Sequence, residues 1–345
     1  MVYWSRWSAI RGRRNEAGGP AERGRGCGRR MLTLFSAPKP FRGHIGVIQR
    51  NALHSWRNLG PDVEVLLIGD EEGMAEEAAG FGVRHLPEVT RNELGTPLVS
   101  SIFALARQNA HHPHLCYVNA DVILLPDLLD AVRRVSARFD RYLLVGRRWD
   151  LNVPEPLTAS PGWEAGLRKR IREEGQLHPP TGSDYFVFPR EMFADMPRFA
   201  LGRAGWDNWM IYAGRRARVP VIDGTGAVTA VHQTHDYAHL PGGQPHFRLA
   251  ESRENVEMGG GRIAVFTIRD TTWRLGQDGL FRRSWRDRGL ARSLEASLYA
   301  ALGAGPARLA RMLLHPFDTA RYYCWAARRR AGRLLRRRPS QATRR

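Results

Sequence analysis

An acidic residue directly after a buried strand is the first feature of this sequence that could do chemistry. Residues 115–127 read LCYVNADVILLPD, in which one apolar run ends at Asn119-Ala120-Asp121 and a second ends at Pro126. Short apolar runs between turn formers are typical of strands buried on both faces of a parallel sheet. A carboxylate at such a strand end is costly unless it is paired, and a divalent cation that holds a diphosphate would pair it. The alternative is that Asp121 only caps the following helix.

Two histidines later in the chain could complete such a metal site. Residues 227–232 are predicted to form a strand, and His232 and His235 stand at its carboxyl end. Imidazole and carboxylate groups together bind Mn²⁺ or Mg²⁺ readily, and diphosphate oxygens can fill the remaining positions. Either histidine could supply the second protein ligand. Histidines at this spacing could also be ordinary surface or core residues.

Two further acids stand where an ionised side chain could act as a base. Asp207 lies at the start of a helix predicted from Trp206 to about Arg215, where the helix dipole favours the charged carboxylate. Asp184 opens a strand predicted over residues 185–188. A base must be ionised and within reach of the hydroxyl that it activates. Each acid could instead only cap its element. Aromatic residues near these acids could stack on a sugar or could pack in the core, and their nearness to polar residues favours stacking. These residues are Trp206, Trp209, Tyr185 and Trp149.

The elements that must position these residues alternate between strand and helix in the first half of the chain. The predicted strands are 31–35, 63–68, 83–86, 115–118 and 142–145, and the predicted helices are 43–59, 75–81, 98–108 and 126–139. This alternation predicts a parallel sheet with right-handed crossovers. After Asp150 the elements become shorter, with a helix at 163–174 and strands at 185–188, 219–222 and 227–232. Polar and aromatic residues gather at the ends of these elements, which suits a substrate site.

The basic charge of the chain is concentrated at its two ends. In a chain of 345 residues with net charge +19, residues 1–30 carry eight Arg and two Glu, and residues 326–345 carry nine Arg and no acid. The ends therefore hold 15 of the 19 net charges, so we expect no nucleic acid to bind the fold itself. Residues 1–30 are predicted to be a disordered basic leader, and residues 326–345 a disordered basic tail.

Cysteine usage and hydropathy favour a cytoplasmic protein. Cys27, Cys116 and Cys324 lie far apart without CxxC spacing, which points to a reducing compartment. No apolar run reaches the roughly 18 residues of a membrane span. Residues 266–325 are predicted to form a basic helical extension with leucines on one face. Such a helix can lie on an anionic membrane, here the inner face, or it can pack on the domain.

The order of the motifs resembles one class of enzymes. The motifs are FSAPKPF, VLLIGDEEG, TRNELGTP, YVNADVILLPD, VGRRWD, PPTGSDYFVF, GWDNW and VTAVHQTHDYAH. Together they resemble bacterial nucleotide-diphospho-sugar transferases of the GT-A type from about Leu32 to Gly243. The resemblance implies an α/β fold of the GT-A (Rossmann-like) kind, with a mostly parallel central sheet flanked by helices. It implies a domain over 31–265, with a nucleotide-binding half at 31–150 and an acceptor half at 151–265.

The resemblance also implies roles for individual residues. Those that would hold the nucleobase and ribose are Ser36, Ala37 and Asp70. The DxD-type motif would be Asn119-Ala120-Asp121, in which Asn replaces the first Asp. Binding of the cation, Mn²⁺ or Mg²⁺, would therefore depend mainly on Asp121, with His232 or His235 as the late ligand.

The implied reaction moves a sugar from a nucleotide-diphosphate sugar to a hydroxyl of an unknown sugar, lipid-linked or small-molecule acceptor. If Asp207 is the base, direct displacement would invert the anomeric centre. Sugar transfer builds negative charge on the departing nucleoside diphosphate, and nearby Arg can neutralise it. Arg91 and the Arg147-Arg148 pair are candidates for this role, although surface Arg are common.

Two other functions fit parts of the sequence. A nucleotidyltransferase that makes a nucleotide sugar would use a similar sheet, but the loop at residues 36–46 lacks its dense glycines. A nonenzymatic adaptor for membrane or nucleic acid would use the Arg-rich ends. The adaptor should lose function when these ends are deleted, whereas the transferase should lose it on Asp121→Ala.

Overall fold

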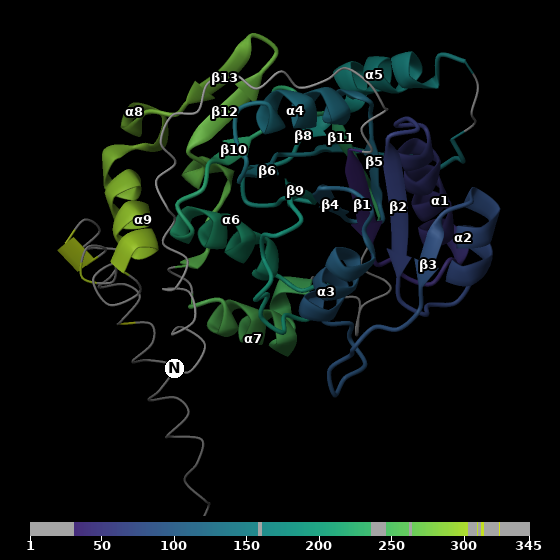
Figure 1. Cartoon of the computed structure of the whole chain (residues 1–345), viewed down its shortest axis with the longest axis horizontal. Helices are drawn as coiled ribbons and strands as arrows, with labels where there is room; N and C mark the ends of the chain where they lie inside the picture. Colours follow the sequence, from purple (N-terminus) through teal and green to yellow (C-terminus); the bar gives the residue numbers. More distant parts are fainter. Residues whose placement is uncertain are drawn as a thin grey trace, which may run out of the picture.

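The computed structural model describes residues 31–157, 161–235, 246–261 and 264–302, together with residues 309, 312, 313 and 324 (Figure 1). The expectations for the leader at 1–30, for the tail at 326–345 and for most of 303–325 lie outside the described residues. The predicted strands and helices of residues 31–235 are present, with ends shifted by three residues or fewer.

The main sheet has nine strands in the order β13-β12-β10-β6-β9-β4-β1-β2-β3. Its strands are β1 (Leu32–Ser36), β2 (Val63–Ile68), β3 (Arg84–Leu86), β4 (His114–Val118), β6 (Leu143–Val145), β9 (Tyr185–Pro189), β10 (Val221–Asp223), β12 (Trp273–Gly276) and β13 (Gly279–Arg282). Five neighbouring pairs are parallel. The exceptions are β9, antiparallel to both neighbours, and the β12–β13 hairpin. The predicted mostly parallel sheet is confirmed.

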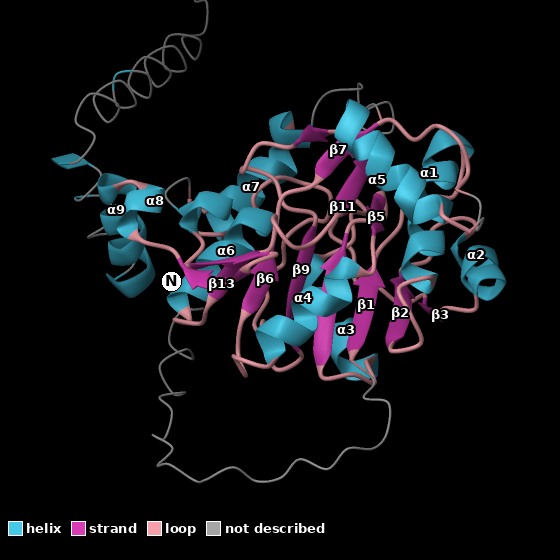
Figure 2. Cartoon of the chain, turned by 90° about the horizontal axis from the view of Figure 1, so that it is seen from above, coloured by secondary structure: helices cyan, strands magenta, loops and turns pink. Residues whose placement is uncertain are grey.

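Helices cover both faces of this sheet (Figure 2). The helices of the described residues are α1 (Gly43–Arg57), α2 (Met74–Phe81), α3 (Val99–Asn109), α4 (Asp127–Ser136), α5 (Trp163–Glu174), α6 (Trp206–Arg216), α7 (Ala250–Met258), α8 (Trp285–Arg288) and α9 (Leu290–Leu302), with 3-10 turns at His246–Arg248 and Ile268–Asp270. Phe35 of β1 packs in the apolar cluster with α3 and α6, and Leu34 packs in the other with α1 and α4. Strands buried on both faces explain the nearly continuous apolar runs in the sequence.

A second, four-stranded sheet has the order β5-β11-β7-β8. Its strands are β5 (Val122–Leu124), β11 (Ala230–Gln233), β7 (Trp149–Leu151) and β8 (Gln176–Leu177). Helix α5 packs on it, with Leu167 and Ile171 in its apolar cluster. The second apolar run of the acidic segment is thus a strand of its own, and Asp121 lies in the turn between the two sheets.

The region after residue 265 differs from the helical extension that the sequence predicted. Residues 273–282 form the β12–β13 hairpin, and β12 extends the main sheet through parallel pairing with β10. The two residues of the hairpin turn are Gln277 and Asp278, and Gly279 after them adopts a φ of 152° that a side chain would disfavour. Helices α8 and α9 follow, as expected. In the described part of the chain, no helix combines the length and apolar character needed to span a membrane.

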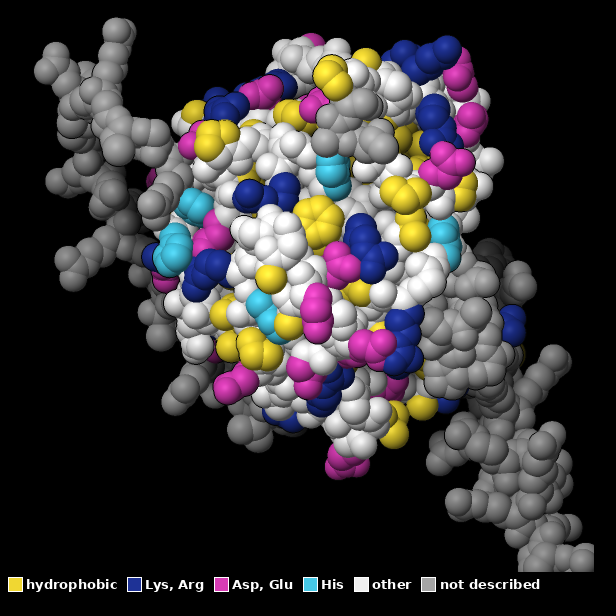
Figure 3. Space-filling model, turned by 90° about the vertical axis from the view of Figure 1, so that its right-hand side faces the viewer, with side chains coloured by type: hydrophobic (Ala, Val, Ile, Leu, Met, Phe, Trp, Pro, Cys, Tyr) yellow, Lys and Arg dark blue, Asp and Glu magenta, His cyan; other side chains and the backbone are white. Residues whose placement is uncertain are grey.

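The surface of the fold carries charges of both signs. Figure 3 views the right-hand side of Figure 1 and shows Lys and Arg interspersed with Asp and Glu, without a broad area of one sign. This mixed face agrees with the sequence, in which 15 of the 19 net charges lie in residues 1–30 and 326–345.

Candidate functional site

Asp121 is held in place by buried amide groups. The backbone N–H of Gln233 donates to the carbonyl of Asp121 at 3.1 Å, and the Gln233 side chain donates to the same oxygen at 3.1 Å. The Gln233 amide also donates to the Ile48 carbonyl at 2.7 Å and accepts from Asn51 at 2.9 Å. These bonds tie the turn after β4 to β11 and to α1, so the position of Asp121 is set by three elements.

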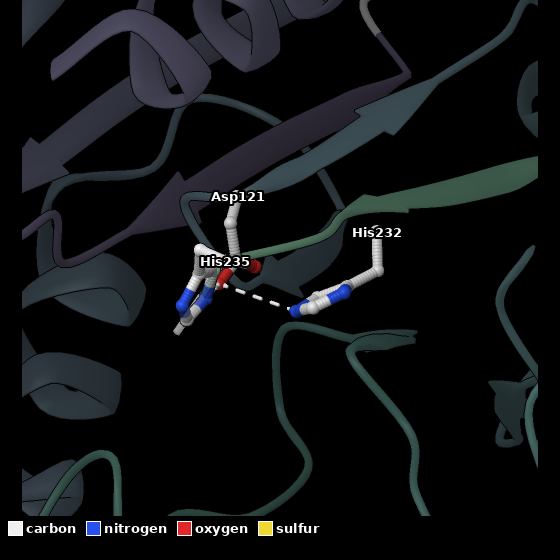
Figure 4. A group of neighbouring side chains, drawn as sticks. All are labelled: Asp121, His232 and His235. Atoms are coloured by element: carbon white, nitrogen blue, oxygen red, sulfur yellow. Dashed lines mark hydrogen bonds and ion pairs between the residues drawn. The ribbon is translucent and has the colours of Figure 1, made fainter. Parts of the chain in front are cut away.

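The structure brings Asp121, His232 and His235 together, although Asp121 and the histidines are more than 100 residues apart in the chain (Figure 4). The Asp121 Oδ2 atom accepts a hydrogen bond from His235 Nε2 at 3.1 Å and lies 3.7 Å from His232 Nε2. One ligand atom from each residue lies within 4.8 Å of the other two. The two imidazoles therefore converge on one carboxylate, as the order of strand ends predicted.

The donor set of this cluster fits a divalent cation. The Asp121 Oδ1 atom is buried and accepts no hydrogen bond from the described residues. Burial alone would raise the pKa of Asp121, but His232, His235 and Lys39 lower it well below its usual range. Burial lowers the pKa of His232, which favours the neutral imidazole that binds metals. An ionised carboxylate with an unsatisfied oxygen beside two imidazoles suits Mn²⁺ or Mg²⁺.

Asn119 and Asp184 form a second polar layer beside Asp121. The Asn119 side chain donates to Asp184 Oδ1 at 2.6 Å, and Arg148 donates to Asp184 Oδ2. The Asn119 oxygen accepts from the Tyr117 hydroxyl at 3.0 Å. Because both oxygens of the buried Asp184 carry a donor, this carboxylate is engaged in holding Asn119 and Arg148.

Asp207 lies in the first turn of α6 and has an unusual acidity. Burial raises its pKa to about 6, against the backbone N–H groups of Asn208 and Gly205, which lower it, and the Asp184 charge raises it further. The N–H groups at the helix start favour the ionised carboxylate, as expected, but burial outweighs them and leaves the pKa above that of an ordinary Asp. A carboxylate with this pKa is still mostly ionised at pH 7 and is a better proton acceptor than an exposed Asp.

The aromatic residues near these acids are parts of the core. Trp206 and Trp209 are buried, and Tyr185 is fully enclosed. The Trp206 ring packs edge-on against Tyr117 at 4.9 Å between centroids. The prediction that Trp206, Trp209 and Tyr185 stack on a sugar is therefore wrong. Trp149 packs against the apolar cluster of the second sheet.

The residues expected to hold the nucleotide have mixed environments. Asp70 lines a hollow of about 560 Å³ together with Glu88, Thr90 and Ser101, where β2 and β3 end and α3 begins. Ser36 is buried, and its hydroxyl donates to the Val118 carbonyl at 2.6 Å inside the sheet. Ala37, next to it, is partly buried against the core. Of the three, the Asp70 side chain is the one at this hollow.

The Arg candidates for charge neutralisation are already engaged. Arg91 pairs with Asp70 and, at 2.9 Å, with Glu71. Arg147 donates to the carbonyls of His178 at 2.5 Å and Leu177 at 3.2 Å. Arg148 pairs with Asp184 and, at 3.0 Å, with Asp150. Of these residues, Arg148 is the one tied to the polar layer beside Asp121.

Sequence reasoning missed Lys39 and Asp150. Lys39 follows β1, and its backbone is clamped from both sides by the Gln49 side chain at 2.7 and 2.8 Å. Burial lowers the pKa of Lys39, although Asp121 raises it. Asp150 lies 3.5 Å from the His232 Nδ1 atom. Its position depends on the pairing of β7 with β11, which leaves no signal in a single sequence.

The backbone of this chain is similar to those of several solved structures, although the sequence identities are low. No family model matches the chain, and no curated protein matches it. Glucosyl-3-phosphoglycerate synthase from Mycobacterium tuberculosis, solved with Mn²⁺, uridine diphosphate and glucosyl-3-phosphoglycerate, is 16% identical with a TM-score of 0.42, over 67% of this chain and 78% of that chain. TarS from S. aureus is 13% identical with a TM-score of 0.42, over 79% of this chain and 44% of that chain.

Proposed function

We propose that this protein is a metal-dependent glycosyltransferase of the GT-A type, which moves a sugar from a nucleotide-diphosphate sugar to a hydroxyl acceptor. The observation that carries the proposal is the convergence of His232 and His235 on Asp121, whose Oδ1 atom is buried without a donor from the described residues. The cluster lies in the turn that follows β4, and ligands of α/β sheets bind at the carboxyl ends of strands.

Asp121, His232 and His235 would hold the cation, Mn²⁺ or Mg²⁺. When bound, the cation would neutralise negative charge that develops on a departing diphosphate. Asp184 holds Asn119 and Arg148 beside this site, which keeps a second positive group close to it. We assign Asp184 this positioning role rather than proton transfer, since both of its oxygens are occupied.

Asp207 is the proposed base, and its pKa of about 6 supports this role. As the acceptor oxygen bonds to the anomeric carbon, its proton passes to the Asp207 carboxylate. The bond between the sugar and the diphosphate breaks, and its electron pair leaves with the nucleoside diphosphate. One displacement of this kind inverts the anomeric centre.

The hollow beside Asp70 is the proposed place of the nucleobase and ribose. Its polar lining offers hydrogen-bond partners for a ribose or base edge, with carboxylates from Asp70 and Glu88 and hydroxyls from Thr90 and Ser101. Arg91 neutralises Asp70, so the hollow does not repel an anionic nucleotide as strongly as its acids suggest.

The proposed setting is the cytoplasm, with contact to an anionic membrane through α9. Leu290, Leu294 and Leu302 follow one another along this helix and are 65%, 47% and 61% exposed. Nine Arg follow in residues 326–345. Apolar side chains next to a basic segment suit a surface of anionic lipid. A lipid-linked acceptor would be met there.

The test measures the binding of nucleotide sugars through the change that they cause in the unfolding temperature of the protein. A ligand that binds the native state raises its unfolding temperature, so UDP or GDP sugars should raise it more with Mn²⁺ than without. The increment that Mn²⁺ adds should vanish in Asp121→Asn and remain in Asp130→Asn, which removes an exposed acid of α4. No increment in the wild-type protein contradicts the proposal.

Product analysis separates the proposal from its rivals. A glycosyltransferase releases a nucleoside diphosphate, whereas a nucleotidyltransferase given a nucleoside triphosphate and a sugar phosphate releases pyrophosphate. A nonenzymatic adaptor would release neither product.

A further inference from the structure

The second sheet places four chain positions side by side in one row. Val122 of β5 is paired with His232 of β11, His232 with Asp150 of β7, and Asp150 with Gln176 of β8. Asp121 immediately precedes Val122. A row of this kind brings neighbouring side chains within reach of one another, so the pairing register puts His232 beside Asp150, while Asp121 approaches His232 from the turn ahead of β5.

The two nitrogens of the His232 ring face different acids. Its Nε2 atom lies 3.7 Å from Asp121 Oδ2, and its Nδ1 atom lies 3.5 Å from Asp150 Oδ1. A histidine that binds a metal through one nitrogen usually donates the N–H of the other to a carboxylate, which fixes its tautomer and orientation. Asp150 stands on the side where such a partner is needed.

Asp150 is itself held by two basic side chains. Its Oδ2 atom contacts His178 Nδ1 at 2.6 Å, and its Oδ1 atom accepts from Arg148 Nε at 3.0 Å. Arg148 also pairs with Asp184. His178 follows β8 directly, and its backbone N–H donates to the Arg148 carbonyl at 2.9 Å. The carboxylate is therefore anchored on β7 by groups that do not belong to the proposed cation cluster.

We infer that Asp150 is a positioning residue for the cation site, which orients His232 by accepting a hydrogen bond from its Nδ1–H group and so leaves Nε2 directed at the cation. His178 and Arg148 hold Asp150 in the orientation that this requires. The inference rests on the proposed function, because it assigns a partner to one of the three proposed ligands.

A simpler effect of Asp150 has to be separated from positioning. Any nearby negative charge attracts a cation, so loss of the Asp150 charge would weaken binding even without an effect on His232. The two effects differ in their dependence on His232. Positioning acts through the imidazole and disappears when the imidazole is removed, whereas attraction by charge persists. A double-mutant cycle measures this difference.

The experiment is a titration of the full chain with Mn²⁺ alone, in which the signal of free Mn²⁺ is followed by electron paramagnetic resonance. The variants are Asp150→Asn, His232→Ala and the double variant, with Asp130→Asn as the control for loss of a distant acid. We expect Asp150→Asn to weaken Mn²⁺ binding about 10- to 100-fold, as is typical when the partner of a metal-binding histidine is removed. In the His232→Ala background the same change should weaken binding less than about 3-fold, well below that range.

His178→Ala provides a second variant if Asp150→Asn does not fold. It should weaken Mn²⁺ binding several-fold in the presence of His232 and leave it unchanged in the His232→Ala background. An equal loss in both backgrounds, or no loss in either, overturns the inference.

Failure of the inference can be told from failure of the proposed function. If the wild-type protein does not bind Mn²⁺, or if Asp121→Asn binds it as tightly as the wild type, the cation site fails and the inference fails with it. If Asp121→Asn abolishes binding while Asp150→Asn and His178→Ala do not alter it, the inference alone is overturned.

Discussion

Two carboxylates at opposite ends of the parallel strands both lie beside histidines, yet their surroundings differ. Glu64 stands near the start of β2, where its oxygens accept from the Thr33 hydroxyl at 2.7 Å and from the His111 backbone at 3.0 Å, and pair with Arg84. Asp121 stands after the end of β4, with two imidazoles and a buried oxygen that accepts nothing from the described residues. Histidine beside an acid therefore does not by itself identify a site. The two carboxylates differ in that the oxygens of Glu64 have donors, whereas Asp121 combines two imidazoles with a buried oxygen that has none in the described part of the chain.

The difference between Asp121 and Glu64 is tested most strongly by the variant Asp121→Asn. This change should lower the rate of sugar transfer by about 10³-fold, because a metal contributes several kcal/mol to stabilising the leaving group and each 1.4 kcal/mol is tenfold. Its unfolding free energy should fall by about 1–2 kcal/mol, since the Oδ2 atom loses its hydrogen bond from His235 whereas the Oδ1 atom has no donor among the described residues to lose. Steady-state kinetics and chemical unfolding measure the two effects. A large loss of stability with retained activity would reverse the roles assigned to Asp121 and Glu64.

A third carboxylate, Asp207, should affect the reaction but not the binding of the cation. Asp207→Asn cannot accept the acceptor's proton, so the rate should fall by at least about 10²-fold. Mn²⁺ affinity should stay within about twofold of the wild type, well short of the tenfold that 1.4 kcal/mol would produce. Measuring turnover and Mn²⁺ binding on the same preparation provides the check. If both fall together, Asp207 supports the fold of the site and is not the base.

Glu64→Gln should show the opposite pattern to Asp121→Asn. An amide here would direct N–H groups at existing donors, so the unfolding free energy should fall by about 1–3 kcal/mol. Although burial would raise the pKa of Glu64, its donors lower it. Its stabilisation is therefore complete above the unfolded-state pKa and is lost as the pH falls through the lower folded-state pKa. Urea unfolding at several pH values tests this, and Mn²⁺ affinity should not change.

The pH dependence of transfer should report Asp207. Because only the ionised carboxylate accepts a proton, kcat/KM should rise about tenfold per pH unit below the Asp207 pKa of about 6 and level off above it. The slow residual reaction of Asp207→Asn should lack this step. A wild-type profile without a step near pH 6 would exclude Asp207 as the base.

The smallest expected effect concerns α9, far from both carboxylates in the chain. Replacing Leu290 and Leu294 by Ser should weaken binding to vesicles of anionic lipid about tenfold, because partial burial of the two side chains in the lipid surface would contribute roughly 1.4 kcal/mol in total. Sedimentation with phosphatidylglycerol vesicles measures the effect, and neutral vesicles are the control. Transfer to a soluble acceptor should be unchanged.

The sequence predicted the first half of the fold well because its strands are buried on both faces. Residues 65–68 and 115–118 are buried and apolar throughout, which gives them a strong signal. The sequence also predicted that Asp121 lies near His232 and His235, but for a different reason from the one observed. His232 lies within β11 of the second sheet, and its pairing with Val122 of β5 brings it beside Asp121.

The contribution of Asp150 could not be predicted in this way. It depends on which strands of the second sheet are neighbours and in which register, and strands of two to four residues carry too few side chains to show this. The packing of Trp206 and Trp209 was missed for a related reason. Their nearness to polar residues in sequence says nothing of the direction in which α6 presents them.

The reversed direction of β9 has a consequence for how the molecule can tolerate change. In the described part of the main sheet, this strand lies between β4, which leads to Asp121, and β6, which leads to the Arg147-Arg148 pair. Asp184, at its beginning, fixes Asn119 on one side and Arg148 on the other. A one-residue insertion between Asp184 and β9 would move the Asp184 carboxylate relative to β4 and β6. Asp184 would then lose its contacts with both Asn119 and Arg148, so we expect the position of Asp184 directly before β9 to vary less than the lengths of the outer loops.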